Sequence, residues 1–84
     1  MGKDVTAVSE EVVRLDVRED LKAGREPFHK IMAAVQALRE GQRLLLVAPF
    51  EPKPLYKVLG RMGFDHTTRQ TEDGAWEVLF FRQG

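Results

Sequence analysis

Basic and acidic side chains gather just ahead of two predicted helices, where they could bind an anion. One group precedes a helix predicted over residues 27–40, and the other precedes a helix that begins near Pro54. A helix N-terminus carries a partial positive charge and unpaired N–H groups, so basic residues beside it favour an anionic ligand. The pattern equally fits glutamates that cap both helices and pair with the basic side chains. The candidate ligand-binding residues are Arg18, Lys22, Gly24, Arg25, Glu26, Glu51 and Lys53.

Few other groups in the sequence suit catalysis. There is no cysteine, which removes disulfides, thiolate metal sites and thiol mechanisms. Ser9 is the only serine, and it lies in a segment, residues 1–9, that we expect to be frayed. No glycine-rich phosphate loop is present. We therefore expect no catalytic residues, no cofactor and no enzyme activity from this chain alone.

The two histidines, His29 and His66, lie far apart in the sequence. A metal site needs several ligands at defined spacing, and no cysteine is present to complete the set. His29 falls in the first turn of a helix, and His66 falls in a polar strand. We predict no metal site.

Composition is that of a single globular domain. The chain has 84 residues, of which 43% are hydrophobic and 31% are charged, and its net charge is zero. No overall charge therefore draws it to nucleic acid or an anionic membrane. The basic residues near the start of the chain alternate with acidic ones, which further disfavours nucleic acid. The apolar run 44–48 is too short to cross a bilayer, and residues 1–9 lack a signal-peptide core, so we expect a cytoplasmic protein.

Apolar spacing predicts a strand and a helix in the first half of the chain. Residues 10–18 alternate, with Val13, Leu15 and Val17 on one side, which is typical of a half-buried strand. Residues 19–26 are predicted to be a charged loop. The helix over 27–40 begins with Pro27 in its first turn and ends before Gly41 in the C′ position. Its predicted core stripe is Phe28, Ile31, Met32, Val35 and Leu38, and we expect aspartate at position 28 or 35 to unfold the domain.

The second half predicts one more helix and three more strands. Residues 43–48 form an apolar strand, and the prolines within 49–54 exclude regular structure there. A helix follows, with Pro54 in its first turn and Gly63 in the C′ position after its end. Next come a polar edge strand over 64–71, a hairpin loop at 72–74 and a final strand over 75–82. The order β-α-β-α-β-β predicts an α+β two-layer sandwich, with a four-stranded mixed sheet and two helices on one face. The first crossover should be right-handed and join parallel strands.

The uncovered face of that sheet could bind a partner. It should carry Arg14, Asp16 and alternate residues of 44–47, together with one of the two side-chain sets of the last strand. An exposed apolar patch there would mean association, so we expect a monomer or a weak homodimer. The alternatives are that the N-terminal segment covers the face or that its apolar residues are scattered singly.

The order of elements, with residues 15–18 leading into Glu26-Pro27, resembles the TusA-like (SirA-like) sulfur-carrier family over residues 12–82. In that family a Cys-Pro-x-Pro motif opens the first helix, and its cysteine carries a persulfide. The matching positions here read Gly24-Arg25-Glu26-Pro27, so the reactive atom is absent and the sulfur-carrier function does not carry over.

A closer resemblance is to a cysteine-less sister family of bacterial domains of unknown function. It rests on residues 25–28 and on the segment 51–55, Glu-Pro-Lys-Pro-Leu. Members of that family often have a histidine before the acidic residue, whereas this chain has Phe50, so no role built on that histidine carries over. The resemblance implies a TusA-like fold, a bacterial source and a link to redox or sulfur metabolism.

Together these patterns lead to two functional hypotheses. The first is a small non-catalytic binding module that uses the helix N-terminal edge for a small ligand or a protein partner. The second is an accessory or carrier subunit that holds an anionic or sulfur-containing metabolite non-covalently at the paired helix N-termini.

Overall fold

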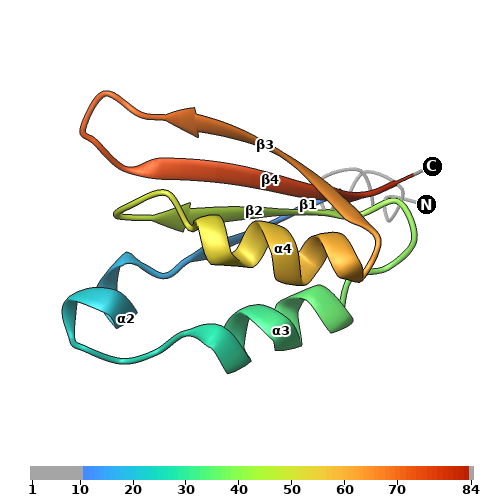
Figure 1. Ribbon diagram of the computed structural model, residues 1–84, viewed down its shortest axis with the longest axis horizontal. Helices are drawn as coiled ribbons and strands as arrows, with labels where there is room; N and C mark the ends of the chain where they lie inside the picture. Colours follow the sequence, from blue (N-terminus) through green and yellow to red (C-terminus); the bar gives the residue numbers. More distant parts are fainter. Residues whose placement is uncertain (1–10, 84) are drawn as a thin grey trace, which may run out of the picture.

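A four-stranded mixed sheet organises the molecule in the computed structural model, which describes residues 11–83 (Figure 1). The strand order is β1-β2-β4-β3, in which β1 and β2 are parallel and β4 runs antiparallel to both of its neighbours. The predicted mixed sheet, parallel first pair and polar edge strand are therefore confirmed. The strands are β1 (Val12–Asp16), β2 (Arg43–Ala48), β3 (Phe64–Gln70) and β4 (Trp76–Arg82).

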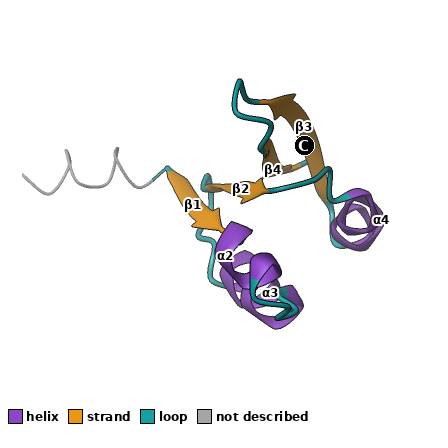
Figure 2. Ribbon diagram, turned by 90° about the vertical axis from the view of Figure 1, so that its left-hand side faces the viewer, coloured by secondary structure: helices purple, strands orange, loops and turns teal. Residues whose placement is uncertain are grey.

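Two longer helices, α3 (Phe28–Gln36) and α4 (Lys53–Arg61), cover one face of the sheet (Figure 2). Ile31 and Val35 of α3 and Leu59 of α4 pack on the core face of β2 and β4, where Leu44, Val78 and Phe80 are fully buried. Leucine, valine and isoleucine at helical and strand spacing thus build one shared core. The predicted two-layer α+β sandwich is confirmed.

A short helix, α2 (Arg18–Lys22), occupies part of the segment that was predicted to be a loop. The Asp16 carboxylate accepts a hydrogen bond from the Arg18 backbone N–H at 3.0 Å, which satisfies a donor at the start of the helix. Two acidic residues in the first turn and Lys22 in the last complement the helix dipole. Leu21 packs against the core. A single half-buried leucine among charged residues gives no periodicity, so the pattern of the sequence did not predict this helix.

The helix α3 is shorter than predicted at both ends. Pro27 is its N-cap residue instead of its first helical residue, and the helix ends at Gln36. Residues 39–42 form a separate turn, closed by a 3.0 Å hydrogen bond from the Gln42 backbone N–H to the Arg39 carbonyl. Gly41 lies in this turn at a φ of 85°, so its predicted C′ role is wrong, although a positive φ is indeed required of it.

Phe28 is not part of the core stripe. Its exposed fraction is 39%, whereas Ile31, Val35 and Leu38 are buried. Phe28 is the first residue of the helix, and its ring lines a hollow that also reaches Leu46 and Ala48 of β2 instead of packing tightly on the sheet. The structure therefore gives no reason for an aspartate at position 28 to unfold the domain. Val35 is only 1% exposed, so an aspartate at position 35 is still expected to do so.

The second half of the chain follows the prediction closely. Pro54 lies in the first turn of α4, and Gly63, at a φ of 93°, follows the C-cap residue Met62. The β3–β4 hairpin turns at residues 72–74, as predicted. The segment 1–9, which was expected to be frayed, lies outside the described residues.

Candidate binding site between two helix N-termini

A pocket of about 220 Å³ opens between the N-termini of α3 and α4. The parallel strands β1 and β2 end at the same edge of the sheet, and each leads on to one of the two helices, so the helix starts converge there. We call this space the helix-end pocket. Its lining includes Val17, Leu21, Phe28, Phe50, Pro54 and Leu55.

The helix-end pocket is apolar. Among residues 11–83, Glu26 is the only charged residue that lines it. Phe28 and Phe50 lie at its mouth with exposed fractions of 39% and 53%, so two aromatic rings meet solvent beside a hollow. Neither residue was predicted as a site residue. The isolated Phe50 between two prolines was the one available signal, because a large apolar side chain in a proline-rich loop has no periodic core position to fill.

Two of the four predicted cationic residues, Arg18 and Arg25, are paired with carboxylates. Arg18 donates from Nη2 to Asp16 Oδ2 at 2.7 Å, and its Nη1 lies 3.7 Å from Asp73 Oδ2. Asp20 is 3.4 Å from Arg25 Nε and 2.9 Å from Lys30 Nζ. These ion pairs neutralise much of the positive charge that would attract an anion.

The remaining predicted residues are accessible but dispersed. Lys22 and Lys53 are exposed, on α2 and at the start of α4 respectively, with no ion pair recorded within residues 11–83. Gly24 is exposed in the loop between α2 and α3 at a φ of 78°, and Glu26 is exposed beside the pocket. The structure thus brings all the predicted site residues to one end of the molecule without focusing the cations on a common point.

The two helix N-termini offer different numbers of backbone donors. In α4, the Lys53 N–H donates to the Glu51 carbonyl at 2.9 Å and the Leu55 N–H donates to the Pro52 carbonyl at 3.0 Å, while Pro54 has no N–H. The first turn of α4 is therefore closed to an anion. In α3, the first backbone N–H that donates to a carbonyl within the described residues is that of Ile31, which bonds to Pro27. The N–H groups of residues 28–30 are therefore available as donors.

Neither glutamate caps a helix. Both N-cap residues are prolines without a side-chain cap, so the capping interpretation of Glu26 and Glu51 is wrong. Glu51 instead accepts a hydrogen bond from the Tyr56 hydroxyl at 3.1 Å. Desolvation, with the neighbouring Glu51, raises the pKa of Tyr56 to about 12.

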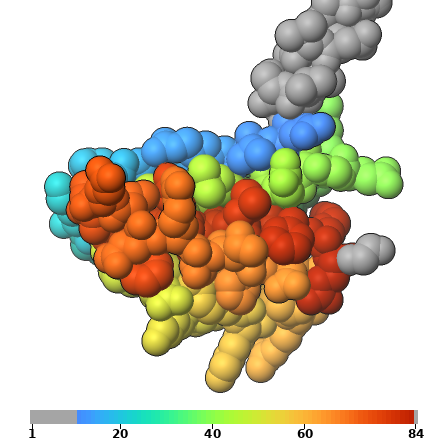
Figure 3. Space-filling model, turned by 90° about the horizontal axis from the view of Figure 1, so that it is seen from above, coloured from blue at the N-terminus to red at the C-terminus, as the bar shows by residue number. Residues whose placement is uncertain are grey.

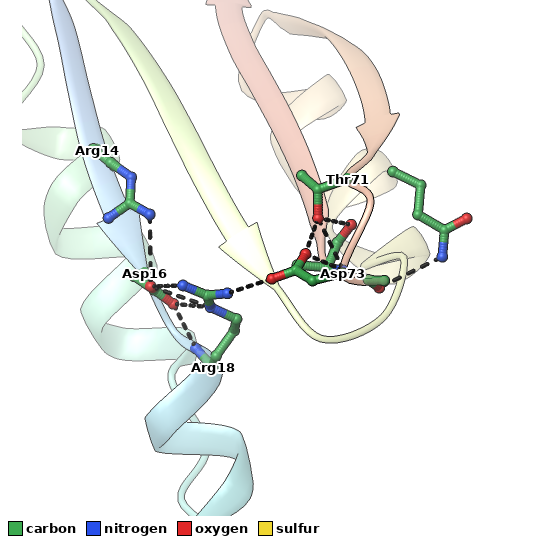
Figure 4. A network of polar contacts seen from close by, with 8 residues as sticks. Arg14, Asp16, Arg18, Thr71 and Asp73 are labelled. Carbon is green, nitrogen blue, oxygen red and sulfur yellow. Dashed lines mark hydrogen bonds and ion pairs between the residues drawn. The ribbon is translucent and has the colours of Figure 1, made fainter.

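A polar network braces the same end of the sheet (Figure 4). Arg18 links Asp16, at the end of β1, to Asp73 in the β3–β4 turn, and so spans the end of β2. Hydrogen bonds from Arg18 lower the pKa of Asp16 to about 2. The Thr71 hydroxyl donates to Asp73 and lowers the pKa of that carboxyl. We interpret this network as structural, because its charges satisfy one another.

The histidines occupy two unrelated environments. His66 stacks on Tyr56, with ring centroids 3.8 Å apart and an interplanar angle of 10°. His29 meets Phe28 edge-on at 6.0 Å. Within residues 11–83 no three His, Asp or Glu side chains are grouped closely enough to hold a metal ion. No helix in the same range has the length and apolar character needed to span a membrane.

The uncovered face of the sheet is less exposed than its sequence predicts. The pairing register places Leu79 and Phe81 on this face and the alternating set from Trp76 to Phe80 on the core face. Val47 is only 2% exposed, and it lies between Asp16 and Glu77 in the register. Among the described residues of this face, only Val12 is a strongly exposed apolar side chain. Leu45, Leu79 and Phe81 of this face are half-buried, so its apolar surface is only partly exposed.

Comparison with known proteins identifies a family. The model of the uncharacterised conserved protein family DUF2249 matches residues 14–82, a span that contains every residue of the helix-end pocket. No curated protein and no solved structure is significantly similar to the chain. The predicted relationship to domains of unknown function is thereby confirmed, and the chain belongs to the DUF2249 family.

Proposed function

We propose that this chain is a small binding module without catalytic chemistry of its own, and that the helix-end pocket receives one bulky apolar side chain of a protein partner. The observation that carries the proposal is an apolar hollow flanked by two exposed phenylalanines. Partners in protein complexes commonly anchor themselves by placing an aromatic or large aliphatic side chain in such a desolvated pocket.

The size of the pocket favours a side chain over a whole metabolite. Pockets that enclose a small-molecule ligand measure about 300–1,000 Å³, whereas this one measures about 220 Å³. Phe28 and Phe50 would flank the anchor and exclude water from it. Lys22 and Lys53, which are exposed near the mouth, would contact polar groups around the anchor.

The alternative is an accessory or carrier subunit that holds an anionic or sulfur-containing metabolite at the paired helix N-termini. The geometry supports this alternative less well, because the first turn of α4 has no free backbone N–H and Arg18 and Arg25 are paired with carboxylates. Its best remaining feature is the start of α3. The order of elements supports a TusA-like fold for this module, while the absence of cysteine removes persulfide transfer.

The proposal is tested by selecting peptides from a random display library on the immobilised protein and measuring their dissociation constants. We expect the selected peptides to share a bulky apolar residue. Phe50→Ser and Phe28→Ser should each weaken their binding about 10-fold, the equivalent of about 1.4 kcal/mol. Met62→Ser is the matched control, because Met62 is 38% exposed but lies at the other end of α4.

Two outcomes would count against an apolar anchor site. One is that the selected peptides bind Phe50→Ser as tightly as the wild type. The other is that inorganic phosphate, titrated while amide chemical shifts are followed, moves the signals of residues 28–30 while no peptide is enriched. The second result would favour the metabolite alternative.

A further inference from the structure

The edge strand β3 presents an unusually open side to solvent. It has seven residues, all paired in continuous register with β4, with no bulge, no proline and no lysine. Natural sheets usually protect an edge with such features, with other charged side chains or with a covering segment. The charges that β3 carries are Asp65 and Arg69, which have opposite signs. In Figure 1 no helix or strand lies beyond β3, and in the space-filling view of Figure 3 its orange atoms face the viewer.

The phase of the β3–β4 ladder identifies which backbone groups are unpaired. At one end the Thr71 N–H donates to the Ala75 carbonyl at 2.8 Å, and at the other the Gln83 N–H donates to the Gly63 carbonyl at 2.9 Å. Odd-numbered residues of the strand therefore point their N–H and C=O groups at β4. The even-numbered residues, Phe64, His66, Thr68 and Gln70, point theirs to the free edge. The His66 N–H accordingly turns to its neighbour, the Asp65 carboxylate, at 2.9 Å.

We propose that β3 pairs in antiparallel fashion with β3 of a second copy of this chain, about a two-fold axis through Thr67. The two sheets then form one continuous eight-stranded sheet. In this register Asp65 lies opposite Arg69 of the second copy, and Arg69 lies opposite Asp65 of the second copy. Opposite charges and paired threonines directly across two strands both stabilise an antiparallel pair.

The hydrogen-bond phase fits the same axis. The Thr67 pair is a non-hydrogen-bonded pair at the new interface, because both Thr67 residues already bond to β4. His66 then exchanges two backbone hydrogen bonds with Thr68 of the second copy, and Phe64 exchanges two with Gln70. Every N–H and C=O that now points to the free edge gains a partner.

The other antiparallel registers of two β3 strands bring like charges together or leave the charges without a partner. An axis through Asp65 places two carboxylates opposite each other, and an axis through Arg69 places two guanidinium groups opposite each other. An axis through Thr68 leaves both charges opposite threonines, and an axis through His66 leaves Asp65 opposite Thr67 and Arg69 opposite Gly63. Only the axis through Thr67 pairs both charges. Arg69 already contacts Glu77 of its own chain at 2.5 Å, so in the dimer it lies between two carboxylates.

The proposed contact between the two β3 strands buries little area. Seven residues at about 3.4 Å each make an edge about 24 Å long. Such a contact is smaller than a standard protein–protein interface, so we expect association only at high concentration. It uses the edge of the sheet and not the uncovered face, and it leaves the helix-end pocket open.

Engineered cysteines test the axis cleanly, because the chain has no cysteine of its own. Thr67→Cys brings two sulfur atoms together in a non-hydrogen-bonded pair, whose Cα atoms lie about 4.5 Å apart. Gln70→Cys is the control, since position 70 is equally exposed but lies about 20 Å from its symmetry mate in this register. Under mild oxidation at high protein concentration, we expect Thr67→Cys to form the disulfide-linked dimer at least about 10-fold faster. Equal rates for the two variants would overturn the proposal.

Charge variants provide a second, independent measurement by sedimentation velocity. Asp65→Arg alone places two arginine pairs across the interface, and Arg69→Asp alone places two aspartate pairs there. We expect each variant alone to remain monomeric at concentrations where the wild type dimerises. We expect their equimolar mixture to dimerise, because each Arg then faces an Asp. A mixture no more associated than its components, with both variants folded by circular dichroism, would reject this register.

Discussion

The two edge strands of the sheet, β1 and β3, differ in length and in charge pattern. In β1, the Val17 N–H donates to the Val47 carbonyl, so even-numbered residues face its free edge. An antiparallel pair of β1 strands centred on Arg14 would place two arginines opposite each other. In β3 the charges are arranged symmetrically about Thr67 and attract. An axis through Leu15 would instead place Arg14 opposite Asp16, so charge alone does not separate the two edges. The clearer differences are that β1 has five residues against seven in β3, and that Asp16 already binds Arg18 of its own chain.

Different contacts also hold the two edges of the sheet in place, the β1 side and the β3 side. On the β1 side, Arg18 braces the strand end through ion pairs with Asp16 and Asp73. On the β3 side, the contacts are mainly aromatic: His66 stacks on Tyr56 and meets Phe80 at a tilt. Polar braces depend on pH and salt, whereas aromatic packing depends on buried area. Four sets of substitutions test this difference between the β1 side and the β3 side.

The largest expected effect is on the core that both sides share. Leu59→Ala, from α4, should cost about 2–5 kcal/mol of unfolding free energy, because Leu59 is fully buried. Val35→Ala, from α3, removes a smaller side chain and should cost somewhat less. Denaturant unfolding, followed by far-UV circular dichroism and by Trp76 fluorescence, measures both. Coincident transitions are expected in each variant, and separate transitions for the two probes would mean that the sides unfold independently. Phe28→Ala, at a half-exposed position, is the control.

Two glycine changes, one inside α4 and one just after it, should alter stability in opposite directions. Gly60 lies inside the helix with open space where a Cβ would point, so Gly60→Ala should stabilise the protein by about 0.5–1 kcal/mol. Gly63 has a φ of 93°, so Gly63→Ala should destabilise it by about 1 kcal/mol. Melting temperatures of the two variants check this. A loss of stability in Gly60→Ala would contradict the helix position assigned to that residue.

Removal of the Tyr56 hydroxyl tests the β3 side at high pH. Tyr56→Phe loses the hydrogen bond to Glu51 and should cost about 0.5–1.5 kcal/mol at neutral pH. The folded pKa of Tyr56, about 12, is raised above its usual value of 10.0. This contribution is therefore complete below pH 10 and is lost as pH rises towards 12. The stability difference between wild type and Tyr56→Phe should narrow over that range, and a constant difference would argue against the shift.

The smallest expected effect is on the acid side of the β1 brace. Ion pairs as accessible as this one contribute about 0.2–1 kcal/mol. The pKa of Asp16 falls from 3.8 to about 2 in the folded chain, so its contribution is present above pH 3.8 and is lost as pH falls towards 2. Asp16→Asn should flatten the loss of stability in that window. Arg69→Gln, on the other side of the sheet, is the control that leaves this brace intact.

Much of the fold could be predicted because its signals are local. The apolar run of residues 43–48 was assigned as a strand with the bounds that the structure has. Pro54 and Gly63 marked the two ends of α4 through backbone rules that any chain obeys. Failures fell where a local signal was weak or absent: α2 depends on the Asp16 side chain, and α3 ends early although its spacing continues to Leu38.

The residues predicted to form a site lie at the same edge of the sheet as the helix-end pocket, but the pocket itself is apolar. Charged residues in the loops pointed to the helix N-terminal edge, and the helix-end pocket lies there. What the sequence could not show was that Arg18 and Arg25 turn to carboxylates, and that Phe28 and Phe50 line the hollow. Side-chain partners across loops depend on distances that no spacing rule contains.

By itself, the sequence determined the fold class, the shared core and the absence of thiol chemistry, because periodicity and residue type act locally. Only the tertiary structure decided how many donors each helix end retains, which aromatic rings stay exposed, and which backbone groups of β3 face solvent. Those properties arise when segments distant in the chain are packed together, since packing decides which polar groups find partners and which apolar groups are left at the surface.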